Sequence, residues 1–248
     1  MSTRSVSTAI KVIEAVAEHQ PVGLSVLSRE VEIPKATVQR TLLTLEELGW
    51  LAQTDPESGK WTITIHAYAV ASRGSSGSRI RDAAMGPLNA LQLDTAETVH
   101  LAVPDGPNMV VIERLDTPHT LRAFLALGSR VPMHASATGL AYLAASSDDY
   151  LEEYLENPLE ARTPRTVVDP QELRAEVSRT RSQGFALNEQ GLSTGITSLG
   201  AALLGREAGP VGSISISGPS SRVTADRYEE YGKAVRQTAL EISRALSR

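Results

Sequence analysis

The spacing of apolar residues over the first 65 positions predicts three short helices followed by a β-hairpin. Apolar side chains recur at three- and four-residue steps in residues 5–23, 24–33 and 34–48, the period of a helix with one buried face. We expect the first helix to bury Ile10, Ile13 and Ala17, and the third to bury Val38, Thr41, Leu42, Leu45 and Leu48. Residues 60–65, KWTITI, alternate apolar residues with threonine, as a strand does. This order predicts a winged helix-turn-helix.

A stretch rich in glycine and serine follows the hairpin. Residues 71–80, ASRGSSGSRI, have little apolar content and are typical of a linker. The helical pattern resumes before residue 93, but Gly86-Pro87 is expected to interrupt or kink that helix. We therefore assign residues 1–72 to the winged helix-turn-helix, 73–93 to a linker and linker helix, and 94–248 to a second domain.

The second domain contains strands and helices in blocks. Strand patterns occur at residues 97–103, 108–116, 120–127, 185–190, 197–204 and 210–218, and helical patterns at 136–147, 148–157, 169–184 and 224–246. Strands followed by helices and then by further strands predict an α+β domain with a mainly antiparallel sheet.

The composition excludes several classes of protein. The 248 residues contain no cysteine, which excludes disulfides, thiolate metal sites and cysteine nucleophiles. The N-terminus has no pattern of a signal peptide, and no stretch approaches the roughly 20 apolar residues of a membrane span. We expect a cytoplasmic protein that does not enter the membrane.

The net charge of −5 does not by itself argue against nucleic acid. Residues 1–79 carry 8 Lys and Arg against 8 Asp and Glu, whereas residues 80–248 carry 16 against 21. The excess acid lies in the second domain, and a neutral first domain can still present a basic face.

The free face of the third helix carries groups that can contact DNA. Lys35, Gln39 and Arg40 lie off the apolar face, near the helix N-terminus. Glutamine can pair with adenine and arginine with guanine or phosphate, and a helix N-terminus favours phosphate. The DNA-binding candidates are Ser25, Lys35, Ala36, Thr37, Gln39, Arg40 and, in the wing, Lys60. The alternatives are an ordinary solvated helix face and a plain hairpin lysine.

Two stretches of the second domain suggest a small-molecule site. In VPMHASATG, residues 131–139, Ala137 and Thr138 offer backbone N–H groups at a helix start, which suit a carboxylate. In residues 210–218, Ser213, Ser215 and Ser217 alternate with isoleucines and line one strand face with hydroxyls. The alternatives are a capped helix with His134 bonded internally, and a strand face in contact with water.

The order of these pieces resembles the IclR family of bacterial transcriptional regulators over nearly the whole chain. The resemblance is carried by LSREVEIPKATVQRTLLTLEELGWL, TAETVHLAV, VVIERLDTPHTLRAFLALGSRVPMHASATG and GPVGSISISGP. It implies a GAF- or profilin-like α/β effector-binding domain, and a homodimer or dimer of dimers on a palindromic operator of double-stranded DNA. The effector-binding residues that it implies are Met133, Ala137, Thr138, Asn188, Ser198, Ser215 and Ser217.

Two of these positions depart from the family pattern. Asn188 stands where the family often has an acidic residue, and Ser198 where it often has a cysteine. The effector is therefore expected to be an organic acid or an aromatic compound rather than necessarily a small keto acid. Met109, Met133, Leu127 and Phe124 could supply apolar walls.

No pattern in the chain indicates an enzyme. The histidines at 19, 66, 100, 119 and 134 lack metal-ligand spacing, and there is no GxSxG or P-loop motif. We expect no cofactor, no metal and no catalytic residue. The alternatives are a hydrolase that pairs Ser215 or Ser217 with His134, and a module that binds only protein.

Overall fold

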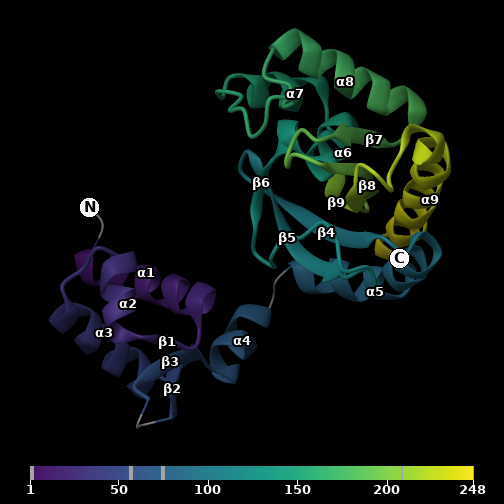
Figure 1. Ribbon diagram of the computed structural model, residues 1–248. Coiled ribbons are helices and arrows are strands. Elements are labelled where there is room, and N and C mark those ends of the chain that lie inside the picture. Colours follow the sequence, from purple (N-terminus) through teal and green to yellow (C-terminus); the bar gives the residue numbers. More distant parts are fainter. Residues whose placement is uncertain (1–2, 56–57, 74–75, 208, 248) are drawn as a thin grey trace. The chain divides into compact units, whose positions relative to one another are not determined.

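The computed structural model describes residues 3–55, 58–73, 76–207 and 209–247. The chain forms two compact units, Met1–Ser75 and Ser76–Arg248 (Figure 1). The turn residues Pro56 and Glu57 and the linker residues Gly74 and Ser75 lie outside the described residues.

The first unit is a winged helix-turn-helix, as predicted. Helices α1 (Arg4–His19), α2 (Leu24–Glu30) and α3 (Lys35–Glu47) pack beside a small antiparallel sheet in the order β1 (Val22–Gly23), β3 (Lys60–Ile63), β2 (Leu51–Asp55). Its core contains Val12, Val16, Leu27, Val38, Leu42, Leu45, Leu51 and Trp61. The core holds α3 by one face only, so its other face stays accessible.

Some details of this unit differ from the prediction. Helix α1 buries Thr8, Val12, Ala15 and Val16, while Ile10 is 50% exposed. The true stripe therefore includes a threonine, which apolar spacing alone could not find. Leu48 is 61% exposed because α3 ends at Glu47 and the chain turns away at Gly49, whose φ is 76°.

The predicted strand over residues 60–65 ends at Ile63, and a helix follows instead. Thr64 begins α4 (Ile65–Ser72), because its hydroxyl accepts a hydrogen bond from the Ala67 N–H and donates one to the Trp50 carbonyl at 3.1 Å. Threonine is common both in strands and at helix N-caps, and here the cap prevails.

The second unit is built on a six-stranded antiparallel sheet in the order β6-β5-β4-β9-β8-β7. The strands are β4 (Thr98–Asp105), β5 (Asn108–Leu115), β6 (Arg130–Pro132), β7 (Ala186–Glu189), β8 (Ile196–Leu204) and β9 (Pro210–Pro219). The helices are α5 (Ser76–Thr95), α6 (Ala137–Ala145), α7 (Asp148–Leu155), α8 (Pro170–Gln183) and α9 (Tyr228–Leu246), with short 3-10 turns at Met133–Ala135 and Ala225–Arg227. The predicted α+β class with an antiparallel sheet is confirmed.

The sheet has two chemically different faces. Val99, Leu101, Leu199, Ile214 and Ile216 pack under α5 and α9 (Figure 1). Because side chains alternate along a strand, the neighbours of these residues turn to the opposite face. We call this second face, formed by Thr98, His100, Ser198, Ser213, Ser215 and Ser217, the polar face.

Helix α5 runs through Gly86 and Pro87 without interruption, contrary to one of our expectations. Its residues Ile80, Ala84, Leu88 and Leu91 are buried against the sheet and α9. Tertiary packing of this face therefore outweighs the local cost of an internal proline.

The predicted strand at residues 120–127 does not form. Residues 116–129, which we call the strap, are irregular. Alternate carbonyls of the strap accept hydrogen bonds from side chains: Leu121 from Arg222 at 2.9 Å, Ala123 from Thr98 at 3.3 Å and Leu125 from Arg114 at 2.9 Å. The two-residue period that suggested a strand thus reflects side-chain partners rather than a neighbouring strand.

Gly139 offers a test of how closely the start of α6 packs against the backbone of Met133. A Cβ atom at this position would lie 2.1 Å from the Met133 Cα atom and 2.3 Å from its carbonyl oxygen. We predict that Gly139→Ala lowers the free energy of unfolding of this unit by about 3 kcal/mol, because the obstacle is backbone.

Urea unfolding followed by circular dichroism measures this, and fluorescence of Trp50 and Trp61 reports the first unit separately. The control is Gly209→Ala, whose Cβ meets nothing within 4 Å and should change stability by no more than about 0.5 kcal/mol. Equal effects of the two substitutions would contradict the close approach.

Candidate nucleic-acid interface and ligand pocket

The exposed face of α3 carries most of the predicted DNA-binding residues. Lys35, Ala36, Gln39 and Arg40 are exposed, and Thr37 is half-buried. No side chain caps the N-terminus of α3, which starts after Pro34. The positive end of the helix and two cationic side chains therefore lie together on one surface, which suits an anionic partner.

The turn before α3 is fixed by local hydrogen bonds. Ser28 donates to the Ile33 carbonyl at 2.7 Å, and the Ile33 N–H donates to the Ser28 carbonyl at 3.2 Å. Glu32 adopts a φ of 54°, so the chain reverses in the left-handed region. These contacts set the position of α3 relative to α2.

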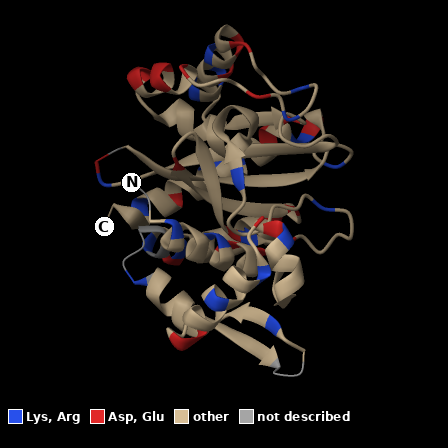
Figure 2. Ribbon diagram, turned by 90° about the vertical axis from the view of Figure 1, so that its left-hand side faces the viewer, with Lys and Arg blue, Asp and Glu red and all other residues tan. Residues whose placement is uncertain are grey.

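The remaining DNA-binding candidates lie on other elements. Ser25 is exposed in the first turn of α2 rather than at its N-cap, which is Gly23. Lys60 is exposed at the first residue of β3. Basic and acidic residues are interspersed on the ribbon of both units (Figure 2). Charge pattern alone does not outline a face, and the candidate interface is defined by α3.

Three predicted effector residues form a row across the polar face of the second unit. Asn188 on β7 pairs with Ser198 on β8, Ser198 with Ser217 on β9, and Ser217 with Thr98 on β4. The next row contains Gly200, Ser215, His100 and Arg114. Strand register therefore brings together residues that are far apart in the sequence.

A small cavity of about 30 Å³ lies at this row. Its lining consists of His100, Ala123, Phe124, Leu125, Asn188, Leu192, Ser193, Ile196, Ser198 and Ser217. Among the described residues that line it, all the polar groups are neutral hydroxyls, an amide and an imidazole. A volume of this size holds about one or two water molecules, so the site is closed in this conformation.

The side chain of Asn188 is held with its amide oxygen occupied. The Asn188 Oδ1 atom accepts a hydrogen bond from the Gly191 N–H at 3.0 Å. A Cβ at residue 191 would lie 2.6 Å from the Asn188 Nδ2 atom, so glycine makes this contact possible. With its oxygen engaged, the NH₂ group is the donor that Asn188 can offer to a ligand.

The other four predicted effector residues do not line this cavity. Ala137 and Thr138 are packed against the sheet, since the Thr138 carbonyl accepts from Ser213 at 2.7 Å and a Cβ at Gly200 would lie 2.5 Å from the Ala137 oxygen. Met133 is fully buried beneath α6. Ser215 is 4% exposed between Gly200 and His100.

His134 is an internally bonded histidine. Its Nδ1 atom lies 2.7 Å from the Tyr154 hydroxyl and its Nε2 atom 3.0 Å from the Glu160 carbonyl. Burial lowers the pKa of His134, and the Glu160 carbonyl opposes this shift. Both ring nitrogens are therefore engaged in holding the chain, which supports the structural interpretation of this residue.

His100 is the cavity residue that the sequence reasoning missed. It is 1% exposed, and burial together with the neighbouring Arg114 lowers its pKa to about 4. Its Nδ1 atom lies 3.4 Å from the Ser217 hydroxyl. Strand alternation in TVHLAV already placed His100 on the face of Thr98, and this signal could have found it.

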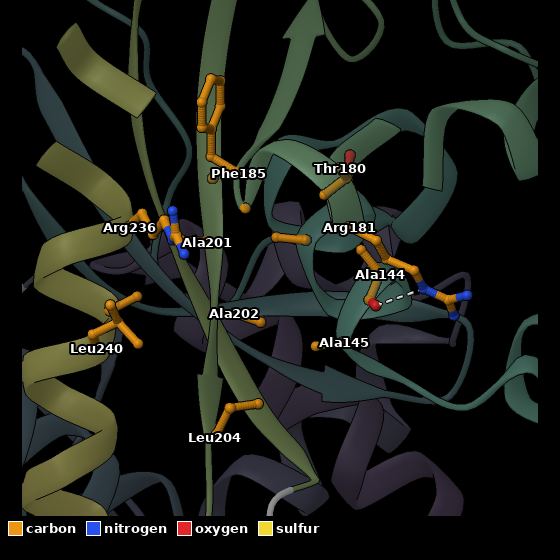
Figure 3. A pocket seen from close by; sticks show the side chains of 14 residues that line it. Ala144, Ala145, Thr180, Arg181, Phe185, Ala201, Ala202, Leu204, Arg236 and Leu240 are labelled. Atoms are coloured by element: carbon orange, nitrogen blue, oxygen red, sulfur yellow. Dashed lines mark hydrogen bonds between the residues drawn. The ribbon is translucent and has the colours of Figure 1, made fainter. Parts of the chain in front are cut away.

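A second, larger cavity of about 180 Å³ lies between α6, α8, α9 and β8 (Figure 3). Alanine is the most frequent residue in its walls, and no predicted effector residue lines it. Arg181 donates to the carbonyls of Ala144 at 2.9 Å and Ser146 at 3.0 Å, and pairs with Asp148 at 2.7 Å. Arg181, one of the residues that line the cavity, thus also closes the C-terminus of α6 (Figure 3).

Neither a metal site nor a membrane-spanning helix is found among the described residues. No group of three or more His, Cys, Asp or Glu side chains there could hold a metal ion. No helix in this part of the chain is long and apolar enough to cross a membrane.

A winged helix-turn-helix joined to an α+β domain with a polar cavity defines the architecture of a two-domain transcriptional regulator. Comparison with known families agrees: residues 5–55 match the IclR helix-turn-helix domain, and residues 75–244 match the bacterial transcriptional regulator IclR C-terminal domain.

Individual relatives extend over nearly the whole chain. The transcriptional repressor IclR of Escherichia coli K12 is 31% identical over 246 residues, 98% of this chain and 89% of that protein. The Thermotoga maritima IclR structure has a TM-score of 0.82 at 26% identity, covering 98% and 99% of the two chains. An IclR homologue from Microbacterium hydrocarbonoxydans, solved with 4-hydroxybenzoate, has a TM-score of 0.85 at 24% identity and covers 98% of each chain.

The chain therefore belongs to the IclR family of bacterial transcriptional regulators. Members of this family are DNA-binding regulators and not enzymes. The alternatives of a hydrolase and of a module that binds only protein are thereby set aside.

The neutral state of His100 predicts a pH dependence of stability. The pKa of His100 in the folded chain is about 4, below the usual 6.5. Between these pH values the unfolded chain therefore binds a proton at His100, and the folded chain does not. Neutral His100 contributes about 3 kcal/mol to the free energy of unfolding above pH 6.5, and this contribution is lost as the pH falls towards 4.

We predict that His100→Asn flattens the dependence of unfolding free energy on pH between 6.5 and 4, measured by urea titration at several pH values. The control is His119→Asn, since His119 is exposed and should leave the slope unchanged. A wild-type slope in His100→Asn would show that His100 titrates normally.

Proposed function

We propose that this chain is a transcriptional repressor that binds a palindromic operator as a homodimer and responds to a small metabolite in the polar-face cavity. The observation that carries the proposal is the row of Asn188, Ser198 and Ser217, which strand register assembles beside a cavity in a domain attached to a winged helix. Its relatives IclR and AllR are repressors, which supports the direction of regulation.

On the DNA side, α3 is the recognition helix. Gln39 would read a base edge in the major groove, while Arg40 and Lys35 would contact phosphate or guanine. The sugar-phosphate backbone of the DNA would be contacted by Ser25, Ala36, Thr37 and the wing residue Lys60. A single recognition helix per chain implies two half-sites for a two-fold dimer, and a dimer of dimers would double that number.

On the metabolite side, the lining favours an organic acid or an aromatic compound. Asn188 replaces a carboxylate that would repel an acid, and it presents an N–H donor. Phe124, Leu125 and Leu192 supply apolar surface. The homologue solved with 4-hydroxybenzoate supports a ligand of this type in this fold. The strap must move to admit it, because the closed cavity measures only about 30 Å³.

The ligand would act by favouring one arrangement of the dimer. A ligand with equal affinity for two arrangements changes neither population, so the cavity must differ between them. A coupling free energy of about 1–3 kcal/mol would change operator affinity roughly 5- to 150-fold.

Substitutions on α3 test the DNA contacts. Gln39→Ala should weaken operator binding by about 1–3 kcal/mol and leave binding to random DNA nearly unchanged, since a base contact is lost. Arg40→Ala should weaken both and reduce the salt slope by about one unit if it contacts phosphate.

Fluorescence anisotropy on operator and random duplexes at several salt concentrations measures both effects. Lys11→Ala is the control for charge, because Lys11 is exposed on α1. Wild-type affinities in both α3 variants would show that this face is only solvated.

The cavity is tested by filling it. Ser198→Leu should abolish the effect of metabolites on operator binding, while basal operator affinity stays within about twofold, because α3 belongs to the other unit. Gel retardation in the presence of a panel of organic and aromatic acids measures the response. Ser182→Leu, at an exposed position of α8, is the control. A normal response of the Ser198 variant would place the effector elsewhere.

A further inference from the structure

His100 is a buried polar group without a complete set of partners. It is 1% exposed, lines the cavity, and its Nε2 atom has no hydrogen-bond partner among the described residues. The other buried histidine of this unit, His134, has both ring nitrogens bonded. Buried polar groups are nearly always paired, so an unpaired one at a cavity wall points to a partner that arrives from the cavity.

The imidazole is in its neutral form. Burial lowers the pKa of His100 to about 4, and Arg114, its direct neighbour on β5, adds to this shift, while Asp116 opposes it. A neutral imidazole offers one donor and one acceptor. The Nδ1 atom faces the Ser217 hydroxyl at 3.4 Å, which leaves Nε2 for the ligand.

The surroundings of His100 disfavour an ionised ligand group at this end of the cavity. Arg114 is the nearest cation, and its Nε atom makes no hydrogen bond, but its charge is paired with Asp116 at 2.9 Å. It also donates to the Leu125 carbonyl at 2.9 Å and stacks on the Phe124 ring at 4.2 Å. None of the described residues lining the cavity is charged at neutral pH. A carboxylate would lose its hydration here without gaining a free cation.

A hydroxyl group fits the free nitrogen of this arrangement. It can donate one hydrogen bond and accept another, so it can pair with Nε2 in either tautomer of the ring. The apolar wall of Ala123, Phe124 and Leu125 suits a hydrocarbon or aromatic body next to that hydroxyl.

We infer that His100 contacts the effector directly and selects one that presents a hydroxyl group, on an apolar body, to this end of the cavity. The inference rests on the proposed function of the cavity as the effector site. An acidic group elsewhere on the same ligand is compatible with it.

A matched pair of probes tests the inference. We would measure binding of 4-hydroxybenzoate and 4-methylbenzoate to the full chain by isothermal titration calorimetry, because the two differ only in a hydroxyl and a methyl group of similar size. The wild type should bind the hydroxylated probe at least about tenfold more tightly, since the methyl group leaves Nε2 unpaired. His100→Leu should remove this preference, and His100→Asn should restore part of it.

The control is Ser213→Ala, on the same strand face but with its hydroxyl bonded to the Thr138 carbonyl rather than lining the cavity. It should keep the preference. A second measurement needs no variant at the cavity during binding: the imidazole Cε1–H resonance of His100, assigned by its absence in His100→Asn, should shift when 4-hydroxybenzoate saturates the wild type.

The inference would be overturned by equal affinity of the wild type for both probes, by no binding of either, by a preference that survives in His100→Leu, or by an unchanged His100 resonance. The proposed function is judged separately. If a metabolite without a hydroxyl group releases the operator from the wild type and fails to do so with Ser198→Leu, the cavity is the effector site and the role of His100 is wrong.

Discussion

The alternation of side chains along β9 is the constraint on which the second unit depends. Ile214 and Ile216 are fully buried under α5 and α9, and Ser213, Ser215 and Ser217 are forced to the other face. A shift of one residue in register would bury the serines in the apolar core and expose the isoleucines, so the packing of the helices fixes the position of the hydroxyls. The polar face is therefore a consequence of how the core is formed.

The strap over this face is held mainly by charged side chains. Arg222 forms a bidentate pair with Glu97, which is 1% exposed, and its remaining nitrogen donates to the Leu121 carbonyl. Arg114 pairs with Asp116 and likewise donates a hydrogen bond to a strap carbonyl, that of Leu125. Removing one partner of a buried pair such as Glu97 and Arg222 costs roughly 3–5 kcal/mol, whereas each bond to a strap carbonyl contributes less. The anchors can stay in place while the strap between them moves.

Elements with a clear hydrophobic period, bounded by residues typical of helix or strand ends, could be predicted from the sequence. Helix α3, the alternating strand 210–218 and the long final helix were found because burial on one face imposes a period. The strap was mistaken for a strand because its partners are side chains of Thr98, Arg114 and Arg222, and two of these, Thr98 and Arg222, lie outside the local sequence pattern. Helix α4 was missed because Thr64 serves equally well in a strand and at an N-cap.

The residues of the candidate pocket also divide into those that the sequence could identify and those that it could not. Asn188, Ser198 and Ser217 came from the family resemblance, and the strand register places them in one row. Ala137 and Thr138, chosen for their free N–H groups, are packed against β8 and β9, because Gly200 allows the backbones to approach closely. Strand alternation assigns His100 to the face of Thr98, but placing it beside Ser215 and Ser217 needs knowledge of which strand pairs with β9, and no local pattern contains that.

The central claim is that the metabolite acts at the polar face beneath the strap. Hydrogen–deuterium exchange of the full chain, with and without a metabolite that releases it from operator DNA, tests this most directly. The account predicts slower exchange in the strap, residues 116–129, and in the loop 190–195, with little change around the alanine-lined cavity of α6, α8 and α9. Protection confined to that second cavity, with the strap unchanged, would contradict it.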